Sequence, residues 1–211
     1  MDKATLLFSA GAIVGAVGAA LLLGNSSGSS SAGSAARANS ARDGAVPPDA
    51  EIPMDLRRTT LVVDDIDNSL KFYSDALGMT KIYDKIIKDP RDAKNIEEST
   101  RWRRLVFLQA NNSYVGVLGL LQYIKPEQPK SKRVETPMQN GSAVLLFNSV
   151  DDVRPKIEKA GKVPGARVHD SPVETSYPGY DGKSTIRVIR SVVMDPDGFA
   201  VECNQLLTRL S

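Results

Sequence analysis

Apolar and polar positions in the region after residue 54 follow two different periods. An apolar run at 61–63 passes into an acidic junction at 64–67, and the apolar positions beyond it recur at helical spacing. Asp67 is placed to cap the N-terminus of such a helix, and Gly78 lies where a helix C-terminus favours a positive φ. The pattern predicts a strand followed by a capped helix, with an apolar face formed by Ile66, Leu70, Tyr73 and Leu77.

The same order returns in the second half of this region. The apolar run 145–147 passes into a polar junction, where Asp151 or Asp152 is placed to cap a second helix that ends at Gly161. Further strands are predicted at 79–84, 104–109, 114–122, 163–168, 185–194 and 199–205, and the polar runs 85–102 and 125–140 predict connectors. The chain therefore reads as two βαβββ units in one α+β domain.

The N-terminal part of the chain has a different pattern. Residues 4–24 carry no charge and are about as long as the 20 residues that a membrane-spanning helix needs. Both an uncleaved anchor and an export signal remain open, and we expect a membrane-anchored or exported protein, periplasmic if the source is bacterial. Residues 25–53 are rich in Ser, Gly, Ala and Pro and predict a disordered linker. The folded domain is expected at 54–211.

Composition narrows the possible partners. The 211 residues carry a formal net charge of +2, and no long basic run with interleaved aromatic residues occurs, so we expect no nucleic-acid partner. Cys203 is the single cysteine, which rules out an intrachain disulfide and leaves the compartment open. Phosphate-loop, serine-hydrolase and C-x-x-C motifs do not occur.

The segment Asp195-Pro196-Asp197-Gly198 reads as a tight polar turn before a strand that carries one carboxylate, Glu202. Together with the first strand and helix, this segment resembles the vicinal oxygen chelate superfamily, which includes glyoxalase I, extradiol dioxygenases and bleomycin-resistance proteins. The resemblance implies that the paired units form a cupped mixed sheet around a ligand site. It also implies a small-molecule ligand and suits a homodimer.

The resemblance further implies where a metal would be held. Ligands in metal-dependent members come from the starts of the two first strands and from the last strand of each unit. These positions fall here on Arg58, on Ser142 or within a residue of it, on Gly119 and on Glu202. Only Glu202 is a normal metal ligand, whereas zinc or iron sites need about three or four protein donors. His169, the single histidine, is expected in a surface loop. We expect no cofactor, although zinc, nickel, iron or manganese stays possible.

Strand alternation predicts which side chains enter the cup. Glu202 and Asn204 share a face of the last strand, Cys203 points to the packed side, and Arg58 lies on the corresponding face of the first strand. If the halves are pseudo-symmetric, Arg58 and Glu202 form an ion pair in the place of the metal. In one interpretation Arg58 anchors a ligand and Glu202 accepts or shuttles a proton; in the other the pair is a structural salt bridge.

Two functions remain open from the sequence. The first is metal-independent binding of a small anionic or carbonyl-bearing molecule, and the second is a metal-dependent glyoxalase (lactoylglutathione lyase) or dioxygenase. Whether the protein is an enzyme stays undecided. The candidate catalytic residues are Glu202 and Arg58, and the candidate ligand-binding residues are Arg58, Ser142, Gln122, Asn204 and Tyr180, with Tyr123, Tyr177 and Arg190 as further candidates for the rim.

Overall fold

A computed structural model describes residues 56–111, 116–130, 138–179 and 183–207. The predicted anchor at 4–24, the predicted linker at 25–53 and the candidate residue Tyr180 lie outside these ranges. Among the described helices, none is long and apolar enough to cross a membrane.

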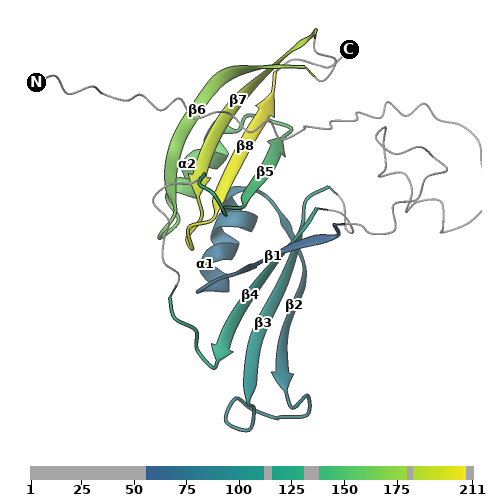
Figure 1. The fold of residues 1–211 in the computed structure, drawn as a ribbon. Helices are drawn as coiled ribbons and strands as arrows, with labels where there is room; N and C mark the ends of the chain where they lie inside the picture. The colour runs from purple at the N-terminus through teal and green to yellow at the C-terminus, as the bar shows by residue number, and fades with distance from the viewer. Residues whose placement is uncertain (1–55, 112–115, 131–137, 180–182, 208–211) are drawn as a thin grey trace, which may run out of the picture.

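The first unit has the predicted βαβββ order (Figure 1). It begins with β1 (Arg58–Val62) and the helix α1 (Ile66–Leu70), which continues as the π-helical segment η1 (Lys71–Ala76). Its remaining strands form a four-stranded sheet with β1 in the order β1-β4-β3-β2, in which β1 is parallel to β4 and the other pairs are antiparallel. These strands are β2 (Thr80–Asp89), β3 (Arg101–Gln109) and β4 (Val117–Lys125).

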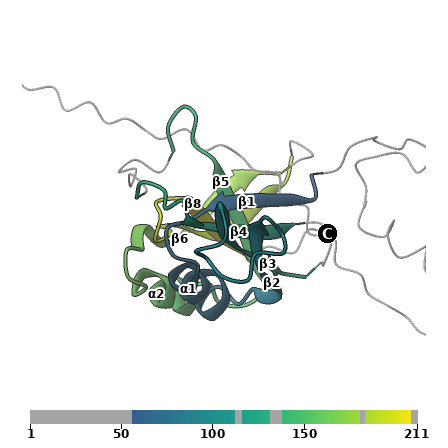
Figure 2. The ribbon, with the colours of Figure 1, turned by 90° about the horizontal axis from the view of Figure 1, so that it is seen from below.

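The second unit repeats this arrangement and confirms the predicted pair of βαβββ units. Its sheet has the order β5-β8-β7-β6, again with the first and last strands parallel. Its elements are β5 (Val144–Ser149), α2 (Arg154–Gly161), β6 (Arg167–Pro178), β7 (Thr185–Met194) and β8 (Ala200–Leu206). Figure 2 shows α1 and α2 side by side on one flank of the molecule.

Helix ends follow local hydrogen bonding. Asp65, rather than the predicted Asp67, caps α1, because its carboxylate accepts the N–H groups of Asp67 (2.9 Å) and Asn68 (3.2 Å). Asp152, one of the two predicted residues, accepts the N–H of Arg154 at the start of α2 (3.1 Å). Gly78 has the expected positive φ of 88°.

Two strand predictions are wrong in extent. The strand predicted at 163–168 begins only at Arg167, because Val163 and Ala166 still form the turn that follows α2, with an N–H to C=O bond of 3.0 Å between them. The polar run 85–102 is only partly a connector, since β2 extends to Asp89 and β3 begins at Arg101.

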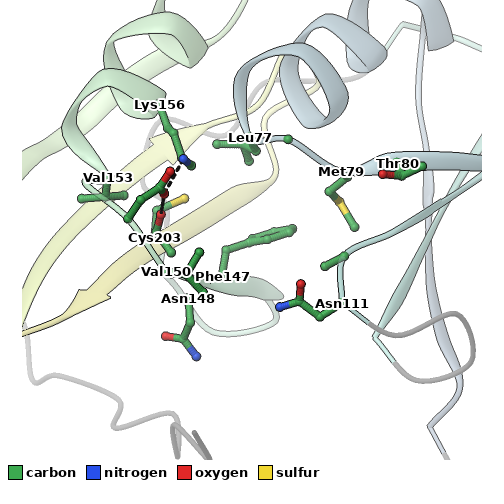
Figure 3. A pocket seen from close by; sticks show the side chains of 14 residues that line it. Leu77, Met79, Thr80, Asn111, Phe147, Asn148, Val150, Val153, Lys156 and Cys203 are labelled. Carbon is green, nitrogen blue, oxygen red and sulfur yellow. Dashed lines mark hydrogen bonds and ion pairs between the residues drawn. The ribbon is translucent and has the colours of Figure 1, made fainter. Parts of the chain in front are cut away.

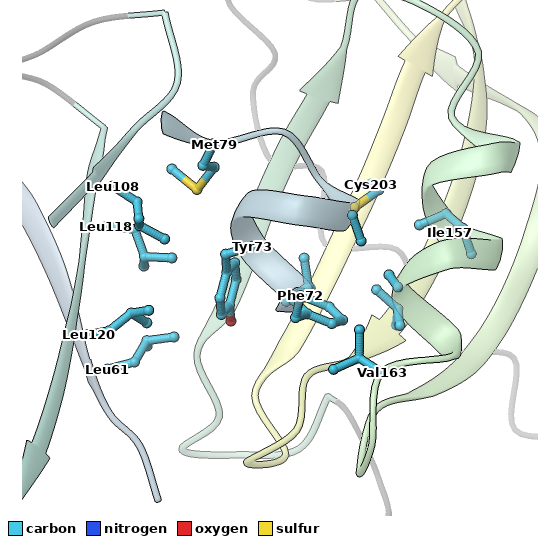
Figure 4. Packing of buried hydrophobic residues seen from close by; sticks show 14 of the residues in the cluster. Leu61, Phe72, Tyr73, Met79, Leu108, Leu118, Leu120, Ile157, Val163 and Cys203 are labelled. Carbon is cyan, nitrogen blue, oxygen red and sulfur yellow. The ribbon is translucent and has the colours of Figure 1, made fainter. Parts of the chain in front are cut away.

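The two units share one hydrophobic core. Phe72 and Tyr73 are fully buried and lie edge to face, with ring centroids 4.9 Å apart. Figure 4 shows Tyr73 facing Leu120 of the first sheet, while Phe72 lies toward Ile157 of α2. The helices therefore pack the two sheets against a common centre, and neither sheet buries its apolar face alone.

A buried polar junction also joins the units at the turn between β7 and β8. The Tyr73 hydroxyl donates to Asp195 (2.8 Å), and Asp197 accepts the N–H of Asp64 (2.7 Å) and the Ser69 hydroxyl (3.3 Å). Asp195 also accepts two N–H groups of its own turn. The acidic residues of this turn therefore have a structural role in the described domain, because their partners lie on the other unit.

Candidate functional site

A cavity of about 510 Å³ lies at the seam between the two sheets, where the edge strands β1 and β5 approach each other. We call it the seam cavity. Its lining comes from both units: residues 56–59, 116–118 and 144–148, together with Met79, Ala110 and Asn111. Its volume lies within the range of about 300–1,000 Å³ that is typical of small-molecule sites.

Arg58 is held in a defined position beside this cavity. Its guanidinium lies 4.2 Å from the ring centroid of Phe107, and its Nε donates to the Thr60 hydroxyl at 3.1 Å. The Tyr83 ring in turn stacks on the Phe107 ring, with the two ring centroids 4.7 Å apart. These contacts restrict the long side chain before any ligand arrives, which lowers the entropy that binding must overcome.

Among the described residues, the charged side chains that line the seam cavity are both basic. Arg57 and Arg58 are its charged lining residues among those described, and no carboxylate lines it. The remaining polar groups are the hydroxyl of Thr59 and the amides of Asn111 and Asn148, and the other walls are mainly apolar. Such a cavity attracts an anion and offers hydrogen bonds to an uncharged polar group.

A second cavity, of about 370 Å³, adjoins the first between the two units, and we call it the inner cavity; its lining includes the exposed Val150. Figure 3 shows Leu77, Met79 and Thr80 of the first unit opposite Val153 and Cys203 of the second. At its rim Lys156 donates to Asp151 (2.5 Å), which also accepts the Ser149 hydroxyl (2.8 Å). The rest of the lining consists of Gly78 and residues 110–111 and 147–150.

Cys203 forms part of the buried wall of the inner cavity, as predicted for the packed face of the last strand. Burial, and to a smaller extent the nearby Glu202 carboxylate, raises the pKa of its thiol to about 12. The thiol is therefore protonated at neutral pH. It is a poor nucleophile and a small apolar wall group.

Glu202 lies on the opposite face of β8 in a separate polar cluster. Its carboxylate accepts the Asn204 amide (3.0 Å) and lies 3.6 Å from the guanidinium of Arg190, which also pairs with Asp170 at 2.9 Å. The side-chain oxygen of Asn204 is buried and has no hydrogen-bond partner among the described residues. This cluster is confined to the second sheet.

The predicted ion pair between Arg58 and Glu202 is therefore wrong. Glu202 pairs with Arg190 because Arg190 lies on the neighbouring strand β7, directly opposite Asn204 in the register. Arg58 lies on the other sheet and uses Phe107 and Thr60 instead. Strand alternation predicted the face of the strand on which each side chain lies, but it could not predict which strands become neighbours.

The remaining candidate residues have mixed positions. Gln122 points to the helix side, where its amide donates to the Asp64 carbonyl (3.1 Å) and accepts the Ile66 N–H (3.2 Å). Ser142 lies in an exposed turn before β5 and accepts the Gln139 N–H (3.3 Å). A role for either in ligand binding stays a prediction. His169 is not in a loop but on β6, half-exposed and 3.7 Å from Asp170.

Sequence reasoning did not find Asn111, Asn148 or Lys156, which line the cavities. No local motif marks these residues, because their common position arises only when the two units pack together. The one signal was the place of Asn148 in the polar junction after the second apolar run.

The positions that hold a metal in the resembling enzymes do not suit one here. The register pairs Gly119 with Thr60 and Glu202 with Leu146, so the structural counterpart of Arg58 is Val144 and not Ser142. A Cβ added at Gly119 would lie 2.6 Å from the Thr60 hydroxyl, so Thr60 would have to move to admit a ligating side chain. Within the described ranges, no group of three His, Cys, Asp or Glu side chains could hold a metal ion. The donor set therefore does not fit a divalent metal.

Comparison with known proteins agrees with this architecture. A family model of the Glyoxalase/Bleomycin resistance protein/Dioxygenase superfamily matches residues 55–203. The chain therefore belongs to this superfamily. No curated protein gave a match.

Several solved structures are similar to this chain at low sequence identity, and the first of these shares the fold. A glyoxalase family protein from Bacillus cereus is 12% identical, with a TM-score of 0.56 over 77% of this chain and 100% of that one. The trypanothione-dependent glyoxalase I of Leishmania major is 21% identical, with a TM-score of 0.45 over 72% of this chain and 86% of that one. TnmS3, an antibiotic binding protein from a Streptomyces species, is 17% identical, with a TM-score of 0.43 over 74% and 99%.

Proposed function

We propose that this domain binds a small anionic molecule in the seam cavity, with the Arg58 guanidinium as the anion-binding group. One observation carries the proposal: the charged groups that line the cavity, within the described part of the chain, are two arginines and no carboxylate. A guanidinium forms two parallel hydrogen bonds to a carboxylate or phosphate, so the expected ligand carries one of these groups.

The pre-ordered geometry of Arg58 supports this role. Phe107 and Thr60 fix the guanidinium on one side of β1, so its remaining N–H groups are available to a ligand without a large loss of side-chain entropy. The ligand carbonyl that the sequence also suggested would find amide donors on Asn111 and Asn148. Glu202 takes no part in this site, because it does not line the cavity.

The proposed test uses benzoate as the anionic probe and benzamide as its neutral counterpart. Calorimetric titration should show that benzoate binds more tightly, and Arg58→Ala should weaken benzoate binding about tenfold to a hundredfold, the usual value of a charged hydrogen bond. Arg154→Ala is the matched control, because this exposed arginine on α2 pairs only with its neighbour Asp152 among the contacts that the described residues make. Equal benzoate affinity in both variants would contradict the proposal.

A metal-dependent glyoxalase or dioxygenase is the alternative function. It would need donors beyond Glu202, supplied by residues outside the described ranges or by a second copy of the chain. Elemental mass spectrometry of the purified protein distinguishes the two functions. Near-stoichiometric metal that is lost in Glu202→Ala would support the enzyme.

Attachment to a membrane through residues 4–24, export of the domain and homodimer formation belong to the same proposal. They rest on the length and apolar character of the N-terminal segment and on the two exposed outer strands, β2 and β6, at which sheets could meet. Membrane fractionation of the full chain tests the first two, and sedimentation tests the third.

A further inference from the structure

The strand β5 has an unpaired edge. It is the end strand of the second sheet, and β8 is its one hydrogen-bonded neighbour among the described strands (Figure 1). No backbone hydrogen bond between described residues joins β5 to β1. The N–H and C=O groups on the outer edge of β5, which belong to every second residue of a strand, therefore have no partner strand within the described domain.

The seam cavity lies along this edge. Five of the six β5 residues line it as the consecutive run Val144 to Asn148, whereas none of the described β8 residues does. Side chains of a strand alternate between its two faces, so a cavity over one face would contact every second residue. Contact with consecutive residues places the cavity beside the backbone of β5, where an added strand would lie.

The sequence of β5 does not protect this edge against pairing. Edge strands commonly carry charged residues or proline, which discourage the addition of another strand. The edge strands β1, β2 and β6 each contain arginine or lysine, and β6 also contains Pro172. The fourth edge strand, β5, reads Val-Leu-Leu-Phe-Asn-Ser and has neither a charged residue nor proline. Of the four, β5 is therefore the best suited to accept an extended chain.

The opposite wall of the seam cavity supplies positive charge. Arg57 and Arg58 line it from the first unit, and the contacts described above hold the Arg58 side chain in place. The side chains of Val144 and Leu146 on β5 are each 37% exposed, so the strand also offers apolar contacts. A chain that lies along β5 in this cavity has the arginines on its other side.

We propose that the seam cavity binds a short peptide with a free C-terminal carboxylate. The peptide adds as a strand to the edge of β5, and its carboxylate lies at Arg58. This proposal rests on the proposed function, because it identifies the anion that Arg58 binds. Main-chain hydrogen bonds to β5 provide affinity with little dependence on sequence, and the mainly apolar walls favour uncharged side chains. The five lining residues of β5 limit the bound segment to about five residues, because paired strands have nearly the same rise per residue.

The first experiment titrates the full chain with the peptide acetyl-Ala-Val-Ala-Val and with forms of it that are methylated at one backbone nitrogen each. The N–H groups of alternate residues of a strand point to the same edge, so methylation at every second residue should weaken binding about tenfold or more. Methylation of the residues between should have a much smaller effect. The C-terminal amide of the peptide is the control for the charged end and should bind less tightly than the acid. Methylation effects that do not alternate would overturn the proposal.

Amide hydrogen exchange gives a second readout on the protein. The peptide should slow exchange at alternate residues of β5, which are those whose N–H groups lie on the outer edge. Benzoate at equal saturation should not slow it, because benzoate has no main chain to pair with the strand. Outer-edge amides that are already protected without the peptide, or that the peptide leaves unchanged, would overturn the proposal.

The two failures can be told apart. If benzoate binds in an Arg58-dependent manner but the peptide gives neither the alternation nor the protection of β5, the peptide proposal fails and the proposed function stands. If benzoate and the peptide each bind as tightly to Arg58→Ala as to the natural protein, the proposed function fails, and the peptide proposal fails with it.

Discussion

At the residue scale, the hydroxyl of Tyr73 and the carboxylate of Asp195 meet at 2.8 Å in a position that water does not reach. Burial raises the pKa of Asp195 to about 6, although the hydrogen bonds from Tyr73 and from the Phe199 N–H act to lower it. The same contact raises the pKa of Tyr73, mainly through desolvation and then through the Asp195 charge. Both carboxylate oxygens of Asp195 accept hydrogen bonds, and these bonds stabilise the junction.

This arrangement predicts a pH dependence of folding. The unfolded carboxyl has a pKa of about 3.9, so the folded state binds more protons between that value and about 6. The contribution of Asp195 to the free energy of unfolding is therefore fully present below about pH 4 and is lost as the pH rises through about 6. Asp195→Asn should remove this slope, which amounts to about 2–3 kcal/mol.

Urea denaturation of both proteins between about pH 4 and pH 7 measures the effect. Asp92→Asn, at an exposed position, serves as the control and should leave the slope unchanged. If the curves of Asp195→Asn and the natural protein stay parallel over this range, the assigned pKa is wrong.

Residue identity predicted some features of the site but not their pairing. Alternation along the last strand correctly separated Cys203 from Glu202 and Asn204, because side chains on one strand alternate between faces. The partner of Glu202 could not be predicted in this way. It depends on the register between β7 and β8, which long-range packing decides.

At the element scale, the pairing of β1 with β4 depends on a close approach at Gly119. A Cβ there would lie 2.6 Å from the Thr60 hydroxyl and 3.2 Å from two of its carbon atoms. Because Thr60 also accepts the hydrogen bond from Arg58, the absence of a side chain at Gly119 affects both the sheet and the anion-binding group.

Gly119→Ala should therefore destabilise the domain by about 1–3 kcal/mol, the usual cost of overpacking a filled site. It should also weaken benzoate binding, because displacement of Thr60 moves Arg58. Denaturant unfolding and calorimetric titration check the two effects. Gly116→Ala is not a suitable control, because Gly116 has a positive φ of 72°, so Arg154→Ala at the exposed start of α2 is used again. Unchanged stability in Gly119→Ala would contradict this account.

The elements were predicted well where local patterning is strong, as for β7, and poorly where packing overrides it. In β6 the residues are largely polar and include Pro172, which usually argues against a strand. The strand persists because β6 is an edge strand, and the register shifts between Asp170 and Val173, at the position of Pro172. No local rule reveals such an irregularity.

At the scale of the whole molecule, the two units resemble each other in topology but do not form separate folding domains. The core contains buried residues of both, and the Tyr73 to Asp195 bond crosses between them. The described region should therefore unfold in one cooperative transition.

Two built-in probes test this cooperativity. Trp102, the single tryptophan, lies on β3 of the first unit, and Cys203 lies on β8 of the second. The denaturant midpoints from Trp102 fluorescence and from Cys203 alkylation should coincide. In Tyr73→Phe both should shift together to lower denaturant, because the buried Asp195 carboxylate loses a donor worth about 1–3 kcal/mol. Separate midpoints would show that the units unfold independently.

We propose that an arginine, and not a metal, holds the ligand in this member of the superfamily. The most direct measurement is the titration of benzoate into metal-stripped protein, before and after addition of zinc, nickel, iron or manganese. We predict the same affinity in every case for the natural protein and a loss of about tenfold or more in Arg58→Ala. Binding that appears only with an added metal, and that survives in Arg58→Ala, would contradict the account.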